Sequence, residues 1–278
     1  MPELPEVELH RRHLEAWLAG HTVVDVKLKP AGLLGGVTAP QLIKRLTGAE
    51  MGVPLRRGKH LALPVASGGA LYMHLGMTGH LTRRWADAPE PRFLTLSLLL
   101  DDGHAVELTD ARRFSKLGWL KTTNIDEEEP FASLGPDLLT ARPDAKALHA
   151  LLQKRRTPIK LALMDQALLA GLGNIHAAEV LWRARIHPAT PANTLDVKQA
   201  AALLKGIDAT FKLVLDHDEG EGVTYVEEPG APNPFKVYAR DDEPCPRCKK
   251  KIAGFTQGGR TTYFCAACQP APRAPRQK

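Results

Sequence analysis

The stretch FLTLSLLLDDGHAVELTD (residues 93–110) holds two short apolar runs on either side of a turn made of Asp and Gly. Runs of the same kind occur at TVVDVKL (22–28), KHLALPV (59–65) and ALYMHLG (70–76), with Gly, Pro and Asp between them. Short apolar runs separated by turn residues are typical of strands. Residues 22–122 therefore predict a β-sandwich or a β-barrel.

The sequence on either side of this region favours helices. Apolar side chains recur near the helical period over residues 4–18, and Gly20 suits the end of a helix. Beyond the strands, the acidic stretch 124–143 contains Pro and Gly and marks a domain boundary. The helical period then returns and predicts helices over Asp144–Lys154, Ile159–Leu169, Ile175–Ala184 and Val197–Asp216.

The predicted fold class is α+β, in four parts. An N-terminal β-sandwich domain with a leading helix covers residues 1–130, and a helical domain covers 131–235. A cysteine ribbon follows at 236–270, and the tail 271–278 is expected to be disordered. A length of 278 residues agrees with more than one domain, at about 150 residues for each.

The overall charge favours a polyanionic partner. The formal net charge is +6 and the sequence pI is about 9.2, so nucleic acid is the first candidate. An ordinary basic soluble protein is the alternative. No apolar run approaches the roughly 18 residues that span a membrane, and the N-terminus MPELPEVELH has no apolar signal core. We therefore expect a cytoplasmic protein without a membrane partner.

The 4 cysteines form two Cys-x-x-Cys pairs, Cys245 with Cys248 and Cys265 with Cys268. Two such knuckles, 16 residues apart, suit one tetrahedral Zn²⁺ ion. Four thiolates leave no open coordination position, so this zinc is expected to be structural. A redox pair or unrelated free thiols are the alternative. Between the pairs, Arg260 follows two glycines near the tip of a predicted hairpin, where a guanidinium can bind a phosphate.

A glycine turn joins two of the predicted helices. Gly171 and Gly173 allow a tight turn, and Asn174 is a suitable N-cap for the helix that begins at Ile175. Free amides at the start of a helix attract phosphate. Lys160 and the basic run 154–156 lie nearby and favour nucleic acid, although helix–turn–helix pieces also occur as simple connectors.

The N-terminus carries a further candidate site. Removal of the initiator methionine would leave a free secondary amine at Pro2, with the carboxylates of Glu3 and Glu6 close behind it. Such an amine can attack a sugar carbon and form an iminium, as lysine does in Schiff-base enzymes. On composition alone, a proline that merely starts a helix explains the same residues.

Six motifs together resemble the formamidopyrimidine-DNA glycosylase / endonuclease VIII family. They are MPELPEVE, RRGKHLAL, HLGMTG, TDARRF, GLGNIHAAE and the cysteine ribbon containing GGRTTYFC, and they occur in this order from Pro2 to Cys268. The resemblance implies a catalytic β-sandwich with a leading helix, then a helix–two-turns–helix domain that ends in a zinc finger.

The resemblance also implies residue roles. Pro2 matches the nucleophile that attacks deoxyribose C1′, Glu3 the proton shuttle, and Glu6 a supporting acid. A second set matches groups that bind DNA phosphates or assist catalysis: Lys59, His74, Asn174 and Arg260. Lys160 is placed with the DNA-binding residues. A third set matches the side chains that fill the hole left by an extruded base: Met77, Arg112 and Phe114. For Met77 and Phe114, ordinary core packing is the alternative.

The implied function is base-excision repair on double-stranded DNA with oxidised or abasic lesions, by a monomer. The enzyme would remove formamidopyrimidine, 8-oxoguanine or oxidised pyrimidines and then cleave the strand by β,δ-elimination as an AP lyase. A catalytically inactive damaged-DNA-binding relative and an RNA-binding zinc-ribbon protein are the alternatives. Within the family, PELPEVE, HLGM and RRF resemble the formamidopyrimidine branch, whereas DQALLAGLGN and PFKVYARDDEPCPRC resemble endonuclease VIII. The loop 219–234 is expected to be mobile and exposed.

Overall fold

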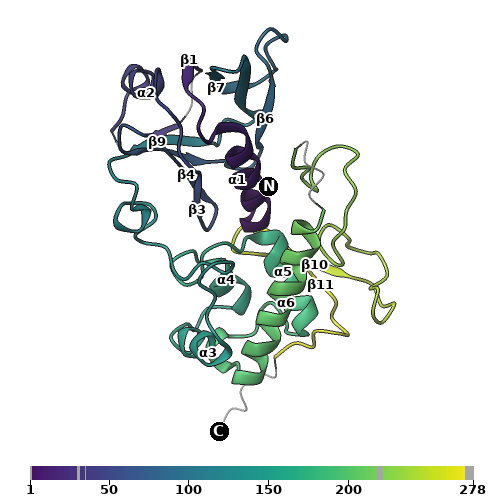
Figure 1. Cartoon of the computed structure of the whole chain (residues 1–278). Coiled ribbons are helices and arrows are strands. Elements are labelled where there is room, and N and C mark those ends of the chain that lie inside the picture. Colours follow the sequence, from purple (N-terminus) through teal and green to yellow (C-terminus); the bar gives the residue numbers. More distant parts are fainter. Residues whose placement is uncertain (1, 30–31, 35, 218–221, 273–278) are drawn as a thin grey trace. The chain divides into compact units, whose positions relative to one another are not determined.

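The computed structural model describes residues 2–29, 32–34, 36–217 and 222–272 (Figure 1). It divides into two compact units: Met1–Ser133 with His217–Ala231, and Leu134–Asp216 with Pro232–Lys278. Residues 217–231, which the sequence prediction places in the helical domain, thus belong to the first unit. The end of the tail predicted to be disordered, residues 273–278, lies outside the described residues.

In the first unit, the described residues form the leading helix α1 (Leu4–Leu18) and two β-sheets. The four-stranded sheet has the order β1-β7-β8-β6, and the five-stranded sheet has the order β2-β9-β5-β4-β3. The predicted leading helix and β-sandwich are therefore confirmed. The strands are β1 (Val23–Leu28), β2 (Gly32–Leu34), β3 (Leu55–Arg57), β4 (His60–Pro64), β5 (Ala70–His74), β6 (Gly79–Trp85), β7 (Leu94–Leu100), β8 (His104–Asp110) and β9 (Lys116–Leu120).

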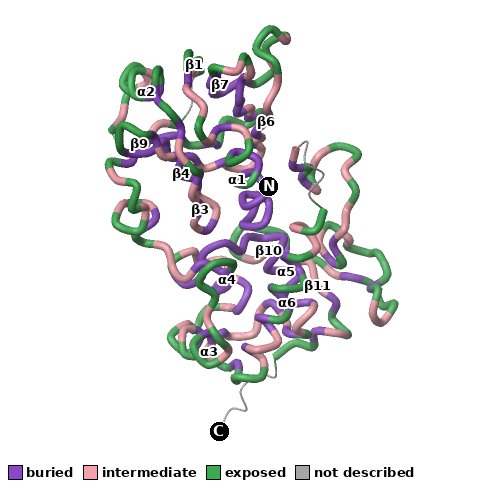
Figure 2. Tube along the Cα trace, viewed as in Figure 1, coloured by how far each residue is buried: buried purple, intermediate pink, exposed green. Residues whose placement is uncertain are grey.

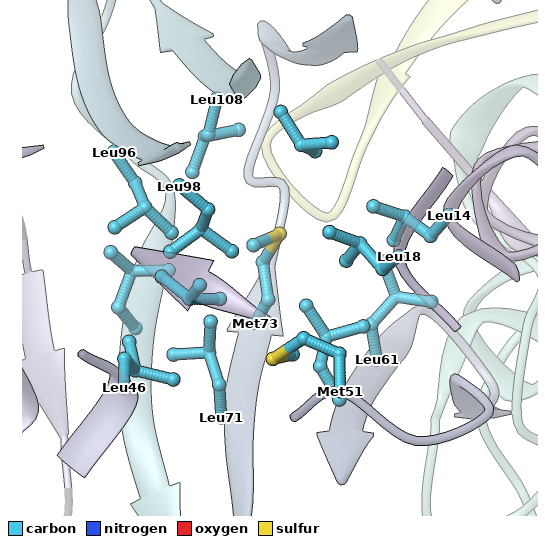
Figure 3. Close-up of a cluster of buried hydrophobic side chains, with 14 of the residues drawn as sticks. Leu14, Leu18, Leu46, Met51, Leu61, Leu71, Met73, Leu96, Leu98 and Leu108 are labelled. Atoms are coloured by element: carbon cyan, nitrogen blue, oxygen red, sulfur yellow. The ribbon is translucent and has the colours of Figure 1, made fainter. Parts of the chain in front are cut away.

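The core of this unit draws side chains from both sheets and from two helices (Figure 3). Leu14 and Leu18 come from α1, and Leu46 comes from α2 (Ala39–Leu46), which the sequence analysis did not predict. Met73 of β5 and Leu98 of β7 represent the two sheets, and each is at most 1% exposed. Burial of this kind stabilises a fold by roughly 1.5–3 kcal/mol per large apolar side chain.

The described residues of the second unit form four α-helices and one β-hairpin. The helices are α3 (Ala145–Gln153), α4 (Ile159–Met164), α5 (Asn174–Ala184) and α6 (Val197–Leu215), and the hairpin consists of β10 (Ala253–Gln257) and β11 (Arg260–Phe264). Helix α5 is buried from Asn174 to Trp182, so it forms the centre of this unit (Figure 2). Within the described part of the chain, no helix has the length and apolarity that a membrane crossing requires.

Helix α4 ends at Met164, five residues before the predicted end at Leu169. The chain leaves the helix at Asp165, whose carboxylate accepts the backbone N–H of Ala167 at 3.0 Å. The side chain of Gln166 then bridges the turn, because its amide donates to two backbone carbonyls and accepts the N–H of Gly171 at 3.0 Å. These local hydrogen bonds replace helical ones and shape the connection to α5.

Candidate active site and nucleic-acid interface

The N-terminus of α1 holds the predicted nucleophile and its two acids. Pro2, Glu3 and Glu6 are all buried, and Glu3 is 0% exposed. The Glu6 carboxylate accepts the backbone N–H of Glu3 at 3.0 Å, which fixes the first turn of the helix. Negative charge is favourable at this end of a helix because the amide dipoles point toward it. Two buried acidic residues therefore follow Pro2 within the first turn of α1.

The predicted phosphate ligands of the first unit lie at one end of the five-stranded sheet. The Nδ1 atom of His74 accepts the backbone N–H of Gly76 at 3.1 Å, so the proton of the neutral ring is on Nε2. Burial, and after it the charges of Lys59 and Lys116, lowers the pKa of His74 to about 4. His74 is thus a neutral hydrogen-bond donor at neutral pH. Its ring centroid lies 4.9 Å from that of His60.

The predicted hole-filling residues come together on two adjacent turns. Met77 lies on the turn after β5, and the exposed Arg112 and Phe114 lie on the turn between β8 and β9. A Cβ atom at Gly76 would lie 2.6 Å from the carbonyl carbon of Phe114, so only glycine lets the two turns approach this closely. The guanidinium of Arg112 stacks on the Phe114 ring at 4.7 Å from its centroid.

Asp110 holds these turns together, and the sequence analysis did not single it out. Its buried carboxylate accepts the hydroxyl of Thr78 at 2.5 Å, the N–H of Arg112 at 3.2 Å and the N–H of Ser115 at 2.6 Å. Burial raises the pKa of Asp110, but the hydrogen bonds from Thr78 and Ser115 outweigh that effect and lower it. In the sequence, the place of Asp110 inside the TDARRF motif was the one sign that this residue has a role.

In the second unit, Lys160, Asn174 and the β-hairpin form one hydrogen-bonded group. The Lys160 ammonium donates to Asn174 Oδ1 at 2.7 Å and to Thr262 Oγ1 at 2.5 Å, and Asn174 Nδ2 donates to the carbonyl of Thr261 at 3.2 Å. Lys160 is 0% exposed, so its charge lies inside the protein and not on its surface. Arg260 is exposed and directly precedes Thr261.

The predicted N-cap role of Asn174 is wrong. Gly173 occupies the cap position with extended backbone, and Asn174 is the first residue of α5. The amide of Asn174 faces Lys160 and Thr261, so it is not available to cap its own helix. The tip of the hairpin packs against α4, because a Cβ added at Gly258 would lie 2.7 Å from a methyl carbon of Leu161.

The four cysteines form the zinc site. Their sulfur atoms all lie within 4.8 Å of one another, with Cys245 and Cys268 at 4.0 Å and Cys248 and Cys265 at 3.4 Å. A tetrahedron with Zn–S bonds of about 2.3 Å has edges of about 3.8 Å, so the donor set fits one structural zinc. The indole N–H of Trp182 donates to Cys245 Sγ at 3.4 Å, which ties the knuckle to α5.

Residues 222–231 contain a buried cluster that the sequence analysis missed. The Tyr225 hydroxyl donates to the carbonyl of Gly79 at 2.6 Å and lies 2.8 Å from Nε2 of His10 on α1. Its ring stacks on His80 at 4.0 Å, and His80 Nε2 lies 3.0 Å from the Glu228 carboxylate.

The predicted exposed loop is therefore only partly correct. Val223 and Tyr225 are buried, because they pack into the first unit, whereas Glu227 and Pro229 are exposed. Residues 219–221 of that loop lie outside the described residues. A single Tyr among Gly, Glu and Pro gave no periodic signal, so its burial could not be predicted from the sequence pattern.

Three family models match the chain in order. They are the formamidopyrimidine-DNA glycosylase N-terminal domain over residues 1–117, the H2TH domain of the same enzymes over 134–225, and a zinc finger found in FPG and IleRS over 242–271.

Curated relatives and solved structures agree with these models. A formamidopyrimidine-DNA glycosylase of Geotalea uraniireducens is 38% identical over 276 residues, covering 97% of this chain and 100% of the relative. One from Streptomyces avermitilis is 37% identical and covers 98% and 99%. A Lactococcus lactis FPG mutant in complex with DNA containing Fapy-dG is similar with a TM-score of 0.87 and 30% identity, covering 97% of this chain and 100% of that one. A complex of the Lactococcus lactis enzyme with DNA containing an abasic site matches with the same TM-score and coverage at 29% identity.

Proposed function

Because this chain belongs to the formamidopyrimidine-DNA glycosylase family, we propose that it excises an oxidised base from double-stranded DNA and then cleaves the strand, with the Pro2 amine as nucleophile. The relatives named above are formamidopyrimidine-DNA glycosylases, and the similar structures hold Fapy-dG or abasic-site DNA. The chain is accordingly a base-excision repair glycosylase.

The observation that carries this proposal is that one unit holds both an N-terminal amine and the hole-filling residues that can replace an extruded base. Pro2 and Glu3 stand at the start of α1, and the stacked Arg112 and Phe114 with Met77 stand on the adjacent turns of the sandwich. A base inside a DNA stack cannot be attacked, so an enzyme of this kind must extrude it and fill the gap. Flexible Met and planar Phe suit the gap, and Arg can donate to the orphaned partner base.

The proposed reaction has three steps. The neutral Pro2 nitrogen attacks C1′ and the C1′–base bond breaks, while the departing base takes a proton from the Glu3 carboxyl group. The Pro2 nitrogen then gives up its own proton, which passes through the Glu3 carboxylate to the ring oxygen as the C1′–O4′ bond opens and the iminium forms. The resulting iminium acidifies the C2′ proton, whose removal expels the 3′ phosphate by β-elimination. A second, δ-elimination then expels the 5′ phosphate. The zinc ion holds the hairpin that bears Arg260 and takes no part in these steps.

Phosphate binding supports the reaction by holding the strand while the nucleotide is extruded. Lys59 and His74 of the first unit and Arg260 of the second are the proposed ligands, with Asn174 as a neutral partner. Lys160 is placed among them as a positioning residue, since its buried ammonium fixes Asn174 and Thr261. We further propose that the chain acts on DNA as a monomer in the bacterial cytoplasm, since its relatives are bacterial DNA glycosylases.

A comparison of wild type with Glu3→Gln tests the proposal. Wild type should release the base from a formamidopyrimidine duplex and nick an abasic duplex. Glu3→Gln should still bind both duplexes but lose base release by about 10²-fold or more, because a general acid typically contributes 10²–10⁴. A wild-type protein that binds lesion DNA and neither releases a base nor nicks the strand would support the damage-sensor alternative.

A further inference from the structure

One end of the five-stranded sheet carries a row of basic side chains on three neighbouring strands. His60 of β4 is directly opposite His74 of β5, and His74 is directly opposite Lys116 of β9. Residues paired in this way point to the same face of a sheet. The contact between the His60 and His74 rings confirms the common face for the first pair. Lys59 immediately precedes His60.

Lys116 is the exposed end of this row. Within the part of the chain that the structure describes, no ion pair to Lys116 is found, and the residue is exposed. Its neighbour on the far side is Gly32 of β2, which has no side chain to cover the lysine stem. A Cβ added at Gly32 would make ordinary contacts with the Ser115 carbonyl oxygen at 3.4 Å and with Cγ of Lys116 at 3.7 Å, so the lysine stem lies directly beside this glycine.

Lys116 is also joined to the hole-filling turn. Lys116 lies two residues after Phe114 in the chain. On the neighbouring strand, His74 lies three residues before Met77. The two segments run side by side, because the Gly76 and Phe114 backbones are in contact. Each segment therefore has one nitrogen-bearing side chain on its strand, His74 or Lys116, and one hole-filling residue on its turn, Met77 or Phe114.

The charge of the row comes from its lysines. Burial first, and then the charges of Lys59 and Lys116, hold the pKa of His74 near 4, and the pKa of His60 is lowered to about 3 by burial, by His74 and by the same two lysines. Both imidazoles are neutral at pH 7 and can bind a phosphate only by hydrogen bonds. Counterion release on DNA binding depends on the cationic groups, here Lys59 and Lys116.

We propose that Lys116 is a DNA-phosphate ligand that binds the backbone of the strand next to the phosphate held by His74. The inference rests on the proposed function, because it takes the sandwich end that bears Met77 and Phe114 as the DNA-facing surface. Neighbouring strands lie about 4.8 Å apart, so the Lys116 stem starts one strand spacing from His74 and reaches beyond it. The contact is to a phosphodiester and is independent of base sequence.

Salt-dependent binding of Lys116→Gln tests this assignment, with Lys121→Gln as the matched control. Lys121 is exposed just beyond the opposite end of the same strand, so its loss removes the same charge away from the row. The logarithm of the association constant for an abasic-site duplex and for an undamaged duplex is measured against the logarithm of the salt concentration. Lys116→Gln should flatten the slope by about 0.9 for both duplexes, whereas Lys116→Arg should keep it.

Two results would overturn the inference while leaving the proposed function intact: a wild-type slope for Lys116→Gln, or an equal loss in Lys121→Gln. In both cases, nicking of the abasic duplex by wild type shows that the proposed function stands. If wild type itself binds the duplex but does not nick it, the proposed function fails, and the slopes still decide whether Lys116 contacts phosphate.

Discussion

Lys160 shows how one buried charge can organise the surface that we propose to contact DNA, without itself being exposed. Its ammonium lies among Asn174, Thr262 and the carbonyl of Thr261, and the exposed Arg260 is the next residue along the hairpin. Burying a charge is costly unless its hydrogen bonds are satisfied, and these oxygens satisfy them. The lysine thereby locks β11 against the start of α5, two elements far apart in the sequence.

Replacing Lys160 by Met should therefore damage structure and binding together. The side chain keeps its length, but Asn174 Oδ1 and Thr262 Oγ1 lose their donor, which should lower the free energy of unfolding by about 1–3 kcal/mol. DNA affinity should fall about tenfold because Asn174 and Arg260 lose their fixed spacing. Urea unfolding and binding to an abasic duplex measure the two effects, with the exposed Lys205→Met as control. Wild-type affinity in Lys160→Met would show that Lys160 positions nothing.

Among the elements, we expect the β10–β11 hairpin to depend on the zinc ion for its structure. The buried apolar cluster beside the hairpin is small: it joins Val237, Ile252 and two of the cysteines to α5 residues Ala178 and Trp182, and from the hairpin strands only the partly buried Tyr263 packs against it. Small domains of this kind commonly fold only with zinc bound. The position of Arg260 is therefore coupled to the zinc.

Cys265→Ser should lose zinc and DNA affinity together, since three thiolates no longer complete the tetrahedron. Elemental analysis should find one zinc per chain in wild type and much less in the variant. Lys250→Ala, an exposed change beside the first knuckle, should keep both properties. Full DNA binding by metal-free Cys265→Ser would contradict the coupling of hairpin and metal.

The segment 222–231 is the element that bears on lesion choice. The Tyr225 hydroxyl is held by Gly79 and His10, and Tyr225 N–H donates to Glu228 at 2.6 Å. A segment anchored in this way cannot close freely over an extruded base. We expect 8-oxoguanine to be held poorly, and formamidopyrimidines and oxidised pyrimidines to be excised at least as fast, because specificity is a difference in transition-state contacts.

Single-turnover rates on matched duplexes test this expectation. If 8-oxoguanine opposite cytosine is the best substrate by about tenfold, which corresponds to roughly 1.4 kcal/mol, the argument from the anchored segment is wrong. The protein would then act like the formamidopyrimidine branch of the family.

These elements also show which features a sequence pattern can predict. Apolar runs such as those of β7 and β8 were found because most of their side chains are buried. Strand β6, with the sequence GHLTRRW, escaped because it is mostly polar and only alternate residues near its start are buried. The motifs identified Met77 and Phe114, but Asp110 and Tyr225 act through contacts between distant segments, which no local pattern records.

At the scale of the whole molecule, buried histidines set the response to acid. Burial lowers the pKa values of His10, His60 and His74 below the ordinary 6.5, with neighbouring positive groups as a smaller cause. Below pH 6.5 the unfolded chain binds protons that the folded chain does not. Stability is therefore full above pH 6.5 and is lost as the pH falls toward 4, by up to about 1.4 kcal/mol per pH unit for each histidine.

Urea unfolding at pH 7.5 and at pH 5.0 should thus give a lower free energy of unfolding at pH 5.0. Carboxylates contribute little in this window, since Asp and Glu of the unfolded chain have pKa values of about 3.9–4.3. Equal or greater stability at pH 5.0 would mean that these imidazoles become protonated within the fold.

The central claim is that the Pro2 amine attacks the deoxyribose, and borohydride trapping on an abasic-site duplex tests it most directly. Reduction of the iminium should give a stable protein–DNA adduct, and peptide mapping should place it at Pro2. A form that retains Met1, or carries an N-terminal tag, should give no adduct and no nick. An adduct on a lysine, or a nicked strand without any adduct, would contradict the mechanism.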